Sequence, residues 1–419
     1  MKPYPFTPSE VERQHPRLMR LLLVGLIIVL AALAGAAYYR LADKGNEHAI
    51  DFFSYWRSGQ LVWQGIDPYQ VALADQVPGI APVPGEKVPS DWRAMPANTA
   101  PLLLLLAPLS RLPWEPASAV WMAINLCLIV LDGALVVRLF NGNLRSWRAP
   151  IIMLAFALLI ATRETVEYGQ TTLFVFASML LAMLAGEQHR VVGGLWLGLA
   201  LSKISLAFPA ALFFLYKRWF RGLTIGILVQ VAGLALIAVI GETNLIAVGL
   251  AYIGIFLFHT DLPGYHLTAG LLQNVGSLAV PIVLTGSIGL WAVVAIWYRS
   301  RRSIIEPHRS TAAVTLFIII MQWNLLTFYH RRYDNAVNIL FLALVLFWVN
   351  GLYSRFNISG AQRYWTNFVA GLCAVVWIAP LYQVLSTATY VALFDLCSLA
   401  ALVTTMLLLF RIPQRDEAH

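Results

Sequence analysis

The chain has 419 residues, of which 59% are hydrophobic and only 12% are charged, and its mean hydropathy is +0.70. Apolar runs of about 17 to 25 residues recur along its whole length, which is typical of a polytopic membrane protein and leaves no room for a soluble core. The formal charge of +8 is carried by short basic clusters between apolar segments, so we interpret it as a topology signal and a contact for membrane lipids, and expect no nucleic-acid partner.

The apolar segments predict an all-α membrane protein with about twelve transmembrane helices and no soluble domain. We expect one integral domain over 1–419, in which a first module (18–225) carries an outer loop at 40–115 and the C-terminal helices (226–419) carry outer loops at 242–278 and 328–335. The predicted spans are 18–39, 116–138, 150–162, 171–186, 191–202, 204–216, 223–241, 279–298, 311–328, 335–350, 366–384 and 388–410. Three of these segments are short, which predicts helices that stop partway beside a cavity.

Residues 98–111 are apolar but short, and they contain two prolines, so they are either a span or a segment that enters and leaves from one side. The re-entrant alternative places 19 of the 29 lysine and arginine residues in the cytoplasm, with both termini. A complete span would instead force 191–216 into one helix with Lys203 at its middle, which is costly. We therefore predict a re-entrant segment. The outward face then collects most polar residues that topology does not explain.

The first outer loop begins with "AIDFFSYWRSGQLVWQGIDPYQ" (49–70), whose aromatic residues recur at helical spacing. This pattern predicts a short helix that lies in the membrane interface. Asp51 at its start could be the helix N-cap, or a general base that faces a lipid-borne substrate. Asp67, within "GIDPY", is expected to be structural because Asp before Pro is typical of turns.

Three aromatic residues of this loop, Tyr55, Tyr69 and Trp92, are candidate sugar or acceptor contacts, although interfacial aromatic side chains also serve as membrane anchors. Gln170 is a fourth candidate contact. It ends "TRETVEYGQ" (162–170), which we predict to be a polar outer loop. Its glutamates could supply a second carboxylate or a metal site, but solvated loop charge is the simpler interpretation.

Basic residues occur at two places where membrane proteins normally avoid positive charge: within an apolar run and on the outer face. Lys203 interrupts an apolar run, and an intramembrane lysine is a functional candidate unless it reaches the interface or pairs internally. His330, Arg331 and Arg332 lie together on the predicted outer face, where a phosphate or ordinary lipid headgroups could offset their charge. We take Lys203, Arg331, Arg332 and Arg163 as candidate ligands of a phosphate and His330 as a catalytic candidate beside Asp51.

Motifs of other enzyme classes are absent: the chain has no Gly-rich phosphate loop, G-x-G-x-x-G, HExxH or G-x-S-x-G. A cytosolic nucleotide-sugar enzyme or an ATP-driven pump would need a soluble nucleotide-binding domain, for which there is no room.

Several stretches between 45 and 225 share a distinctive order and spacing: "DFFSYWRSGQLVWQGIDPY", "TAPLLLLLAPLSRLPW" with "AVWMAINL", "EYGQTTLFVFASMLLA" and "GGLWLGLALSKISLAFPAALFFLYKRWF". Together they resemble the membrane-embedded glycosyltransferases of the GT-C type, and specifically glycosyltransferase family 87, the polyprenol-phosphate-mannose-dependent α-mannosyltransferases.

The resemblance implies transfer of a single sugar, with mannose expected, from a polyprenyl-phosphate donor to a glycolipid or glycan acceptor in one inverting step. It implies that Asp51 is the catalytic base and that the active site faces the extracytoplasmic side of a bacterial inner membrane. The leaving phosphate monoester has a second pKa of about 6 and departs as an anion, so no general acid is needed. No cofactor is expected, and a divalent cation is not expected to be essential.

Two other functions fit a polytopic chain of this kind. A transporter or flippase of lipid-linked sugars would be expected to show repeated halves, and the sequence has no internal repeat. An outer-face ligase that moves whole glycans would use arginine and histidine in place of an aspartate. Replacement of Asp51 by Asn separates these functions, because only single-sugar transfer depends on that carboxylate.

Overall fold

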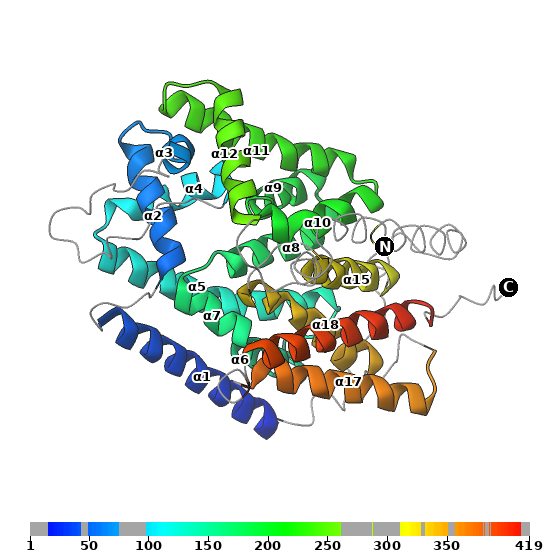
Figure 1. The fold of residues 1–419 in the computed structure, drawn as a ribbon. Coiled ribbons are helices and arrows are strands. Elements are labelled where there is room, and N and C mark those ends of the chain that lie inside the picture. The colour runs from blue at the N-terminus through cyan, green and yellow to red at the C-terminus, as the bar shows by residue number, and fades with distance from the viewer. Residues whose placement is uncertain are drawn as a thin grey trace.

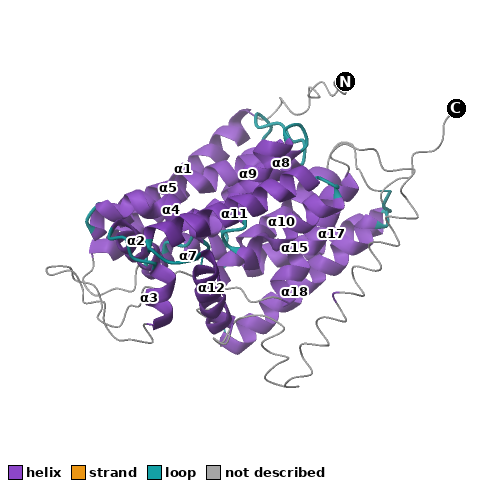
Figure 2. Cartoon of the chain, turned by 90° about the horizontal axis from the view of Figure 1, so that it is seen from above, coloured by secondary structure: helices purple, strands orange, loops and turns teal. Residues whose placement is uncertain are grey.

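The computed structural model describes residues 16–42, 49–74, 98–260, 311–327, 332–350, 357–379 and 387–411, together with positions 287, 381 and 385. Throughout these residues the regular structure is helical and contains no strand (Figures 1 and 2). The predicted all-α class is therefore confirmed for the described part of the chain.

The helices follow the predicted apolar segments closely. In chain order they are α1 (Pro16–Ala42), α2 (Ile50–Trp63), α3 (Pro68–Ala74), α4 (Ala100–Leu106), the 3₁₀ helix η2 (Ala107–Arg111), α5 (Trp114–Leu139), α6 (Arg148–Leu158), α7 (Ile160–Tyr168), α8 (Thr172–Gly186), α9 (Arg190–Ala200), α10 (Ile204–Tyr216), α11 (Phe220–Ile240), α12 (Leu245–Thr260), α15 (Thr311–Thr327), η4 (Arg332–Asn338), α16 (Ile339–Ala343), the π-helix η5 (Leu344–Val349), α17 (Gly360–Ile378) and α18 (Thr387–Leu409).

By length and apolar composition, four of the described helices could cross a membrane: α1, α5, α11 and the main part of α18. The number becomes five if the bent pair α6 and α7 counts as one span. The predicted span at 279–298 lies outside the described residues. Twelve complete crossings therefore remain a prediction, although the other predicted spans each correspond to helical structure.

Contacts between chain segments define two ends of the helical bundle. At one end, named here the site end, the N–H of Ala49 donates to the Glu167 carbonyl (3.0 Å) and the N–H of Thr99 donates to the Ser202 carbonyl (2.9 Å). Figure 1 shows α2, α3, α4 and α12 together in this part of the molecule. The loops that the sequence places outside thus meet one another.

At the opposite end, the loops that the sequence places in the cytoplasm also meet. Leu139, Glu187, Lys217 and Val314 line one cavity there. The Arg148 guanidinium donates to the carbonyl of Asn350 (3.2 Å), and the N–H of Asn357 donates to the carbonyl of Arg411 (2.8 Å). The predicted grouping of the loops into two sets agrees with these contacts, whereas the side of the membrane on which each set lies stays a prediction.

The segment 98–111 runs beside α2, an arrangement compatible with the predicted re-entrant segment, whose position in a membrane stays a prediction. Trp63 and Trp56 of α2 donate their indole N–H groups to the carbonyls of Ala107 (2.7 Å) and Leu112 (3.1 Å), so α4 and η2 run alongside α2. Gly59 permits this approach, since a Cβ at that position would lie 2.8 Å from Ser110 Oγ. The segment thus begins beside Ser202, at the site end, and ends beside Trp56 of α2.

The lysine in the apolar run also breaks its helix where the sequence indicates. α9 and α10 have 11 and 13 residues, too few to cross a hydrocarbon core of about 30 Å at 1.5 Å per residue. They form a hairpin with Lys203 at its turn. Their far ends lie together at the opposite end, where the Arg190 guanidinium stacks over the Trp219 ring at 4.1 Å.

Two predicted outer loops are instead helical. Residues 160–168 form α7, which bends by 57° from α6 at Leu159 and packs against η4. Glu164 is only 7% exposed and Thr165 is buried, so the interpretation as solvated loop charge is wrong. Within the predicted outer loop 242–278, the described part contains the apolar helix α12, which packs against α3 and α11.

Candidate active site

Asp51 lies at the start of α2 but does not cap it. The N-cap position belongs to Ala49, whose backbone is left-handed (φ 55°, ψ 26°), and the helix begins at Ile50. Asp51 is therefore a half-buried residue of the first helical turn. The alternative prediction, that this carboxylate is the N-cap, is wrong. An acidic residue in the first helical turn nevertheless interacts favourably with the partial positive charge of the helix N-terminus.

The start of α2 is fixed by tight packing against the turn between α7 and α8. Gly169 ends α7 in the left-handed region (φ 65°), and its carbonyl accepts the indole N–H of Trp121 at 2.7 Å. The Phe52 ring stacks on Trp121 and on Trp114, with centroid distances of 5.5 and 5.8 Å. These contacts hold the residue next to Asp51 on rigid elements.

Tyr55 lies one turn beyond Asp51 and connects it to the rest of the site. Its side chain is buried, and burial raises the pKa of the hydroxyl, with the negative charge of Asp51 as the next largest cause. Hydrogen bonding to the side chains of Thr171 and Asn98 lowers this pKa, and the charge of Asp334 raises it. The charges of both Asp51 and Asp334 thus act on the Tyr55 hydroxyl.

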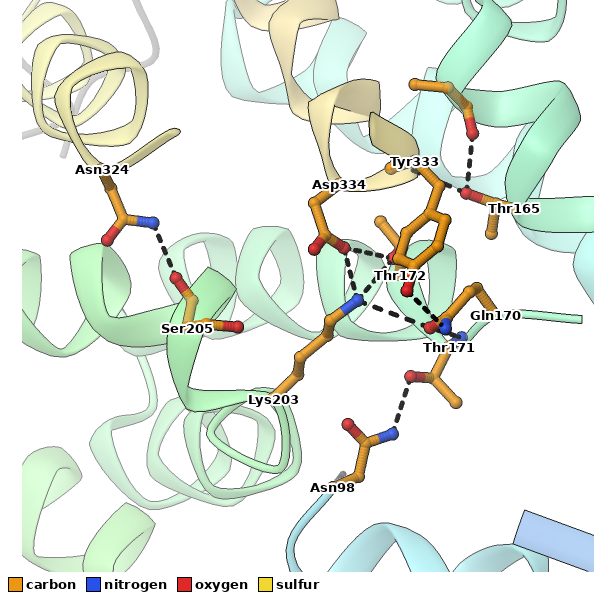
Figure 3. A network of polar contacts seen from close by, with 11 residues as sticks. Asn98, Thr165, Gln170, Thr171, Thr172, Lys203, Ser205, Asn324, Tyr333 and Asp334 are labelled. Carbon is orange, nitrogen blue, oxygen red and sulfur yellow. Dashed lines mark hydrogen bonds and ion pairs between the residues drawn. The ribbon is translucent and has the colours of Figure 1, made fainter. Parts of the chain in front are cut away.

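Lys203 is the centre of a buried polar cluster at the turn between α9 and α10 (Figure 3). Its ammonium forms an ion pair with Asp334 of η4. It also donates to Thr172 Oγ1 at 3.0 Å and to Gln170 Oε1 at 3.5 Å, and it lies 4.8 Å from the centre of the Tyr333 ring. Lys203 therefore pairs internally, one of the alternatives to a direct functional role.

Hydrogen bonds extend this cluster to the start of α8 and to Asn98. Gln170 donates through Nε2 to the Tyr333 hydroxyl (2.8 Å), and Asn98 donates through Nδ2 to Thr171 Oγ1 (2.9 Å). The Thr172 hydroxyl donates to the same Asp334 oxygen that Lys203 contacts, at 2.6 Å. Because Thr171 and Asn98 also interact with Tyr55, one polar network joins the surroundings of Asp51 to Lys203.

The other described candidates lie apart from this cluster or are covered. Arg163 donates to the carbonyl of Ile378 at 3.3 Å, at the end of α17. The Tyr69 ring is fully buried against Tyr252, and its hydroxyl donates to the Asn98 carbonyl at 2.9 Å. A sugar contact at Tyr69 would therefore need this ring to be uncovered.

Asp67 has the structural role that was predicted for it. Its carboxylate accepts the backbone N–H groups of Tyr69 (2.9 Å) and Gln70 (3.4 Å), which start α3. Burial raises the pKa of Asp67, and these two hydrogen bonds act against that rise.

Four of the predicted site residues lie wholly or partly outside the described part of the chain. Trp92, His330 and Arg331 lie outside the described residues, and Arg332 begins η4 with a side chain that is also outside them. Among the described residues, no three His, Cys, Asp or Glu side chains lie close enough together to hold a metal ion.

Sequence reasoning missed Asp334, Thr172 and Tyr333 as members of the site. Asp334 carried a usable signal, because a lysine inside a membrane needs a carboxylate or a cavity, and "RRYDN" places an acidic residue on the same predicted face. Thr172 and Tyr333 have no comparable signal, since their roles depend on how η4 packs against α7 and α8.

Comparison with known proteins gives one family match and two similar relatives. A family model, Glycosyltransferase family 87, matches residues 98–349, which is more than half of the chain and includes Gln170, Lys203 and Asp334. The relatives are the alpha-(1->3)-arabinofuranosyltransferases of Mycobacterium tuberculosis strains CDC 1551 / Oshkosh and ATCC 25618 / H37Rv. Each is 31% identical over 132 residues, which cover 30% of this chain and 30% of the relative. The match thus spans less than a third of each relative.

Proposed function

The chain belongs to glycosyltransferase family 87, and on that premise we propose that it transfers a single sugar from a polyprenyl-phosphate donor to a glycolipid or glycan acceptor. The observation that supports this proposal best is the continuous polar network between the surroundings of Asp51 and Lys203 at the site end. Asp51, whose charge acts on Tyr55, and Lys203 would supply the carboxylate and the ammonium that glycosyl transfer from a phosphate requires.

In the proposed reaction, Asp51 accepts the proton of the acceptor hydroxyl while the hydroxyl oxygen attacks the anomeric carbon of the donor sugar. The new bond forms on the face opposite the phosphate, the bond from carbon to phosphate oxygen breaks, and the phosphate leaves with that electron pair. The configuration at the anomeric carbon is therefore inverted. The buried site lowers the local dielectric and strengthens the interaction of Lys203 with the departing anion.

Five other candidates keep their proposed roles. Arg331 and Arg332 would bind the phosphate as guanidinium forks, and His330 would assist catalysis. Tyr55 and Gln170, which the network joins, would contact the sugar or the acceptor.

Two further parts of the proposal concern architecture and location. We propose a GT-C-type bundle with its active site on the extracytoplasmic face of a bacterial inner membrane. The positive-inside count and the meeting of the outward loops at one end of the bundle support this orientation.

The donor sugar has two candidates. Mannose is the sugar expected from the resemblance described above. Arabinofuranose is the second candidate, because the two relatives are named as arabinofuranosyltransferases and are 31% identical over their matched region. Both sugars would use the same base and the same leaving group, so the site described above does not have to change between them.

The test is a cell-free assay with the purified protein in lipid nanodiscs. Polyprenyl-phosphate mannose and polyprenyl-phosphate arabinofuranose are each supplied with a panel of glycolipid acceptors, and transfer is followed by mass spectrometry. Transfer from either donor supports the function and identifies the sugar. Movement of an intact lipid-linked sugar across the bilayer, with no new glycosidic bond, would instead favour a flippase, and transfer of a whole glycan would favour a ligase.

A further inference from the structure

The buried ion pair between Lys203 and Asp334 has a consequence for how a phosphate can bind. Resting on the proposed function, we infer that Asp334 is a positioning residue that holds and neutralises Lys203, and that the donor phosphate joins this pair by taking over the hydrogen bond that Lys203 now gives to Gln170.

Asp334 is the counter-ion of Lys203 while no phosphate is bound. The lysine is placed at the turn of a hairpin of two short apolar helices, and its side chain is only 11% exposed. A buried ammonium without a counter-ion would be strongly unfavourable. Asp334 supplies that counter-ion from η4, at a sequence separation of 131 residues. The pair therefore ties the turn between α9 and α10 to η4.

The three hydrogen bonds of the Lys203 ammonium are unequal. Asp334 accepts the charge-assisted bond and Thr172 Oγ1 accepts the second at 3.0 Å. Gln170 Oε1 lies at 3.5 Å, beyond the usual range of 2.7–3.2 Å for such bonds. The contact with Gln170 is therefore the one that an incoming oxygen can replace at the smallest cost.

Gln170 does not depend on this contact for its own position. Its Nε2 group donates to the Tyr333 hydroxyl at 2.8 Å, and its Oε1 atom also accepts the N–H of Thr171 at 3.3 Å. After the exchange, both bonds would remain and the amide would stay in place.

The exposure of the pair indicates the side from which an anion approaches. The Asp334 side chain is 2% exposed, whereas that of Lys203 is 11% exposed. Thr172 further fixes the carboxylate by donating to the same oxygen that Lys203 contacts. The anion therefore adds to the lysine side of a fixed pair and does not displace Asp334.

This arrangement has a kinetic consequence that a purely structural ion pair would not have. Asp334 cancels the charge of Lys203, so the pair attracts a phosphate through a directed hydrogen bond more than through net charge. Removal of the negative charge should strengthen phosphate binding, because a bound phosphate then supplies the counter-ion that the buried Lys203 lacks. It should also slow the reaction, because the ammonium is no longer held in one direction. Affinity and kcat should thus change in opposite senses.

The experiment measures binding of farnesyl phosphate, a short polyprenyl monophosphate, to the full-length protein in nanodiscs, with inorganic phosphate as a second probe. Asp334→Asn should bind farnesyl phosphate on the order of tenfold more tightly than the wild type, with kcat reduced about tenfold. Gln170→Glu places a carboxylate where the phosphate oxygen is expected, so its affinity should fall about tenfold while its thermal stability is maintained, since Lys203 gains a second anion.

Asp132→Asn is the matched control, because Asp132 is a fully buried carboxylate in α5 for which the described residues offer no hydrogen-bond partner. It should bind farnesyl phosphate as the wild type does. The inference fails if Gln170→Glu binds with wild-type affinity, or if folded Asp334→Asn binds no more tightly than the wild type. If inorganic phosphate binds as tightly as farnesyl phosphate, the site recognises phosphate without its lipid chain, and the inference that it binds the lipid-linked donor is contradicted. If Asp334→Asn does not fold, Gln170→Glu alone decides, and absence of transfer by the wild type identifies failure of the proposed function itself.

Discussion

Gly169 offers a sharp test of how the start of α2 is held. Its backbone is left-handed (φ 65°), and a Cβ there would lie 2.7 Å from Phe52 Cβ and 3.2 Å from Ala49 Cβ. Both neighbours are Cβ atoms attached directly to the backbone, and the Phe52 ring is stacked on Trp121, so neither can move without the start of α2. Gly169→Ala should therefore displace the turn that carries Asp51.

The expected loss of stability has two parts. A non-glycine residue in the left-handed region costs about 1–2 kcal/mol. Overpacking against Phe52 and Ala49 adds about 1–3 kcal/mol. Gly65→Ala is the matched control, because Gly65 has a similar φ of 76° but its nearest contact would be the Ile240 carbonyl at 3.6 Å. The control should lose the first part only.

The assay combines unfolding by denaturant, followed by tryptophan fluorescence, with sugar transfer at a temperature where both variants are folded. Gly169→Ala should be about 1–3 kcal/mol less stable than Gly65→Ala. Its kcat should fall on the order of 100-fold, the usual effect of a displacement of about 1 Å at a catalytic group. Equal stability of the two variants, or full activity of Gly169→Ala, would refute the packing argument.

Three further predictions concern the metal, the ionisation of Tyr55 and the orientation. Transfer should persist in excess EDTA, because a departing phosphate monoester can be stabilised by Lys203 and the arginines; loss of activity that Mg²⁺ restores would show otherwise. Burial and the charge of Asp51 raise the pKa of Tyr55, so the unfolded chain ionises first and stability should fall as pH rises above about 10. Tyr55→Phe should reduce that fall, measured as the unfolding midpoint between about pH 8 and pH 11, and an unchanged slope would contradict it. In a cysteine-free background, the exposed positions Gln64→Cys and Arg218→Cys should react differently with an impermeant maleimide added outside. The first should be labelled and the second protected, and the reverse pattern would overturn the orientation.

Two kinds of argument predicted much of the fold: the helical spacing of apolar residues, and the free-energy cost of a charged side chain inside a membrane. The aromatic residues of 50–63 repeat at helical spacing, and α2 buries Phe52, Tyr55 and Trp56 as that spacing indicates. The position of Lys203 was equally informative. A charge at the centre of one transmembrane helix costs more free energy than a charge at the turn between two short helices, and α9 and α10 do meet at Lys203. The same argument predicted that 98–111 enters and leaves from one side; hydrogen bonds from Trp56 and Trp63 hold this segment beside α2, and its place in the membrane stays a prediction.

The arrangement of the site could be predicted only in part. Local composition made 162–170 look like a solvated loop, because nothing in it shows that most of these residues belong to the helix α7 or that η4 packs against that helix. The N-cap position went to Ala49 and not to Asp51, since the N–H of Ala49 bonds to Glu167, a contact 118 residues away. Asp334 was passed over beside Arg331 and Arg332, whose charge was the more conspicuous feature. Long-range pairing of this kind depends on tertiary packing.

In the proposed reaction, the Asp51 carboxylate acts as the base and the Lys203 ammonium stabilises the leaving phosphate of the same sugar donor. The most direct measurement compares the wild type with Asp51→Asn and Asp132→Asn in the cell-free transfer assay, with folding checked by thermal unfolding. We predict that Asp51→Asn loses transfer by about 100-fold to 10,000-fold, as expected for removal of a general base, while Asp132→Asn retains it. Transfer by folded Asp51→Asn at the wild-type rate would contradict the account.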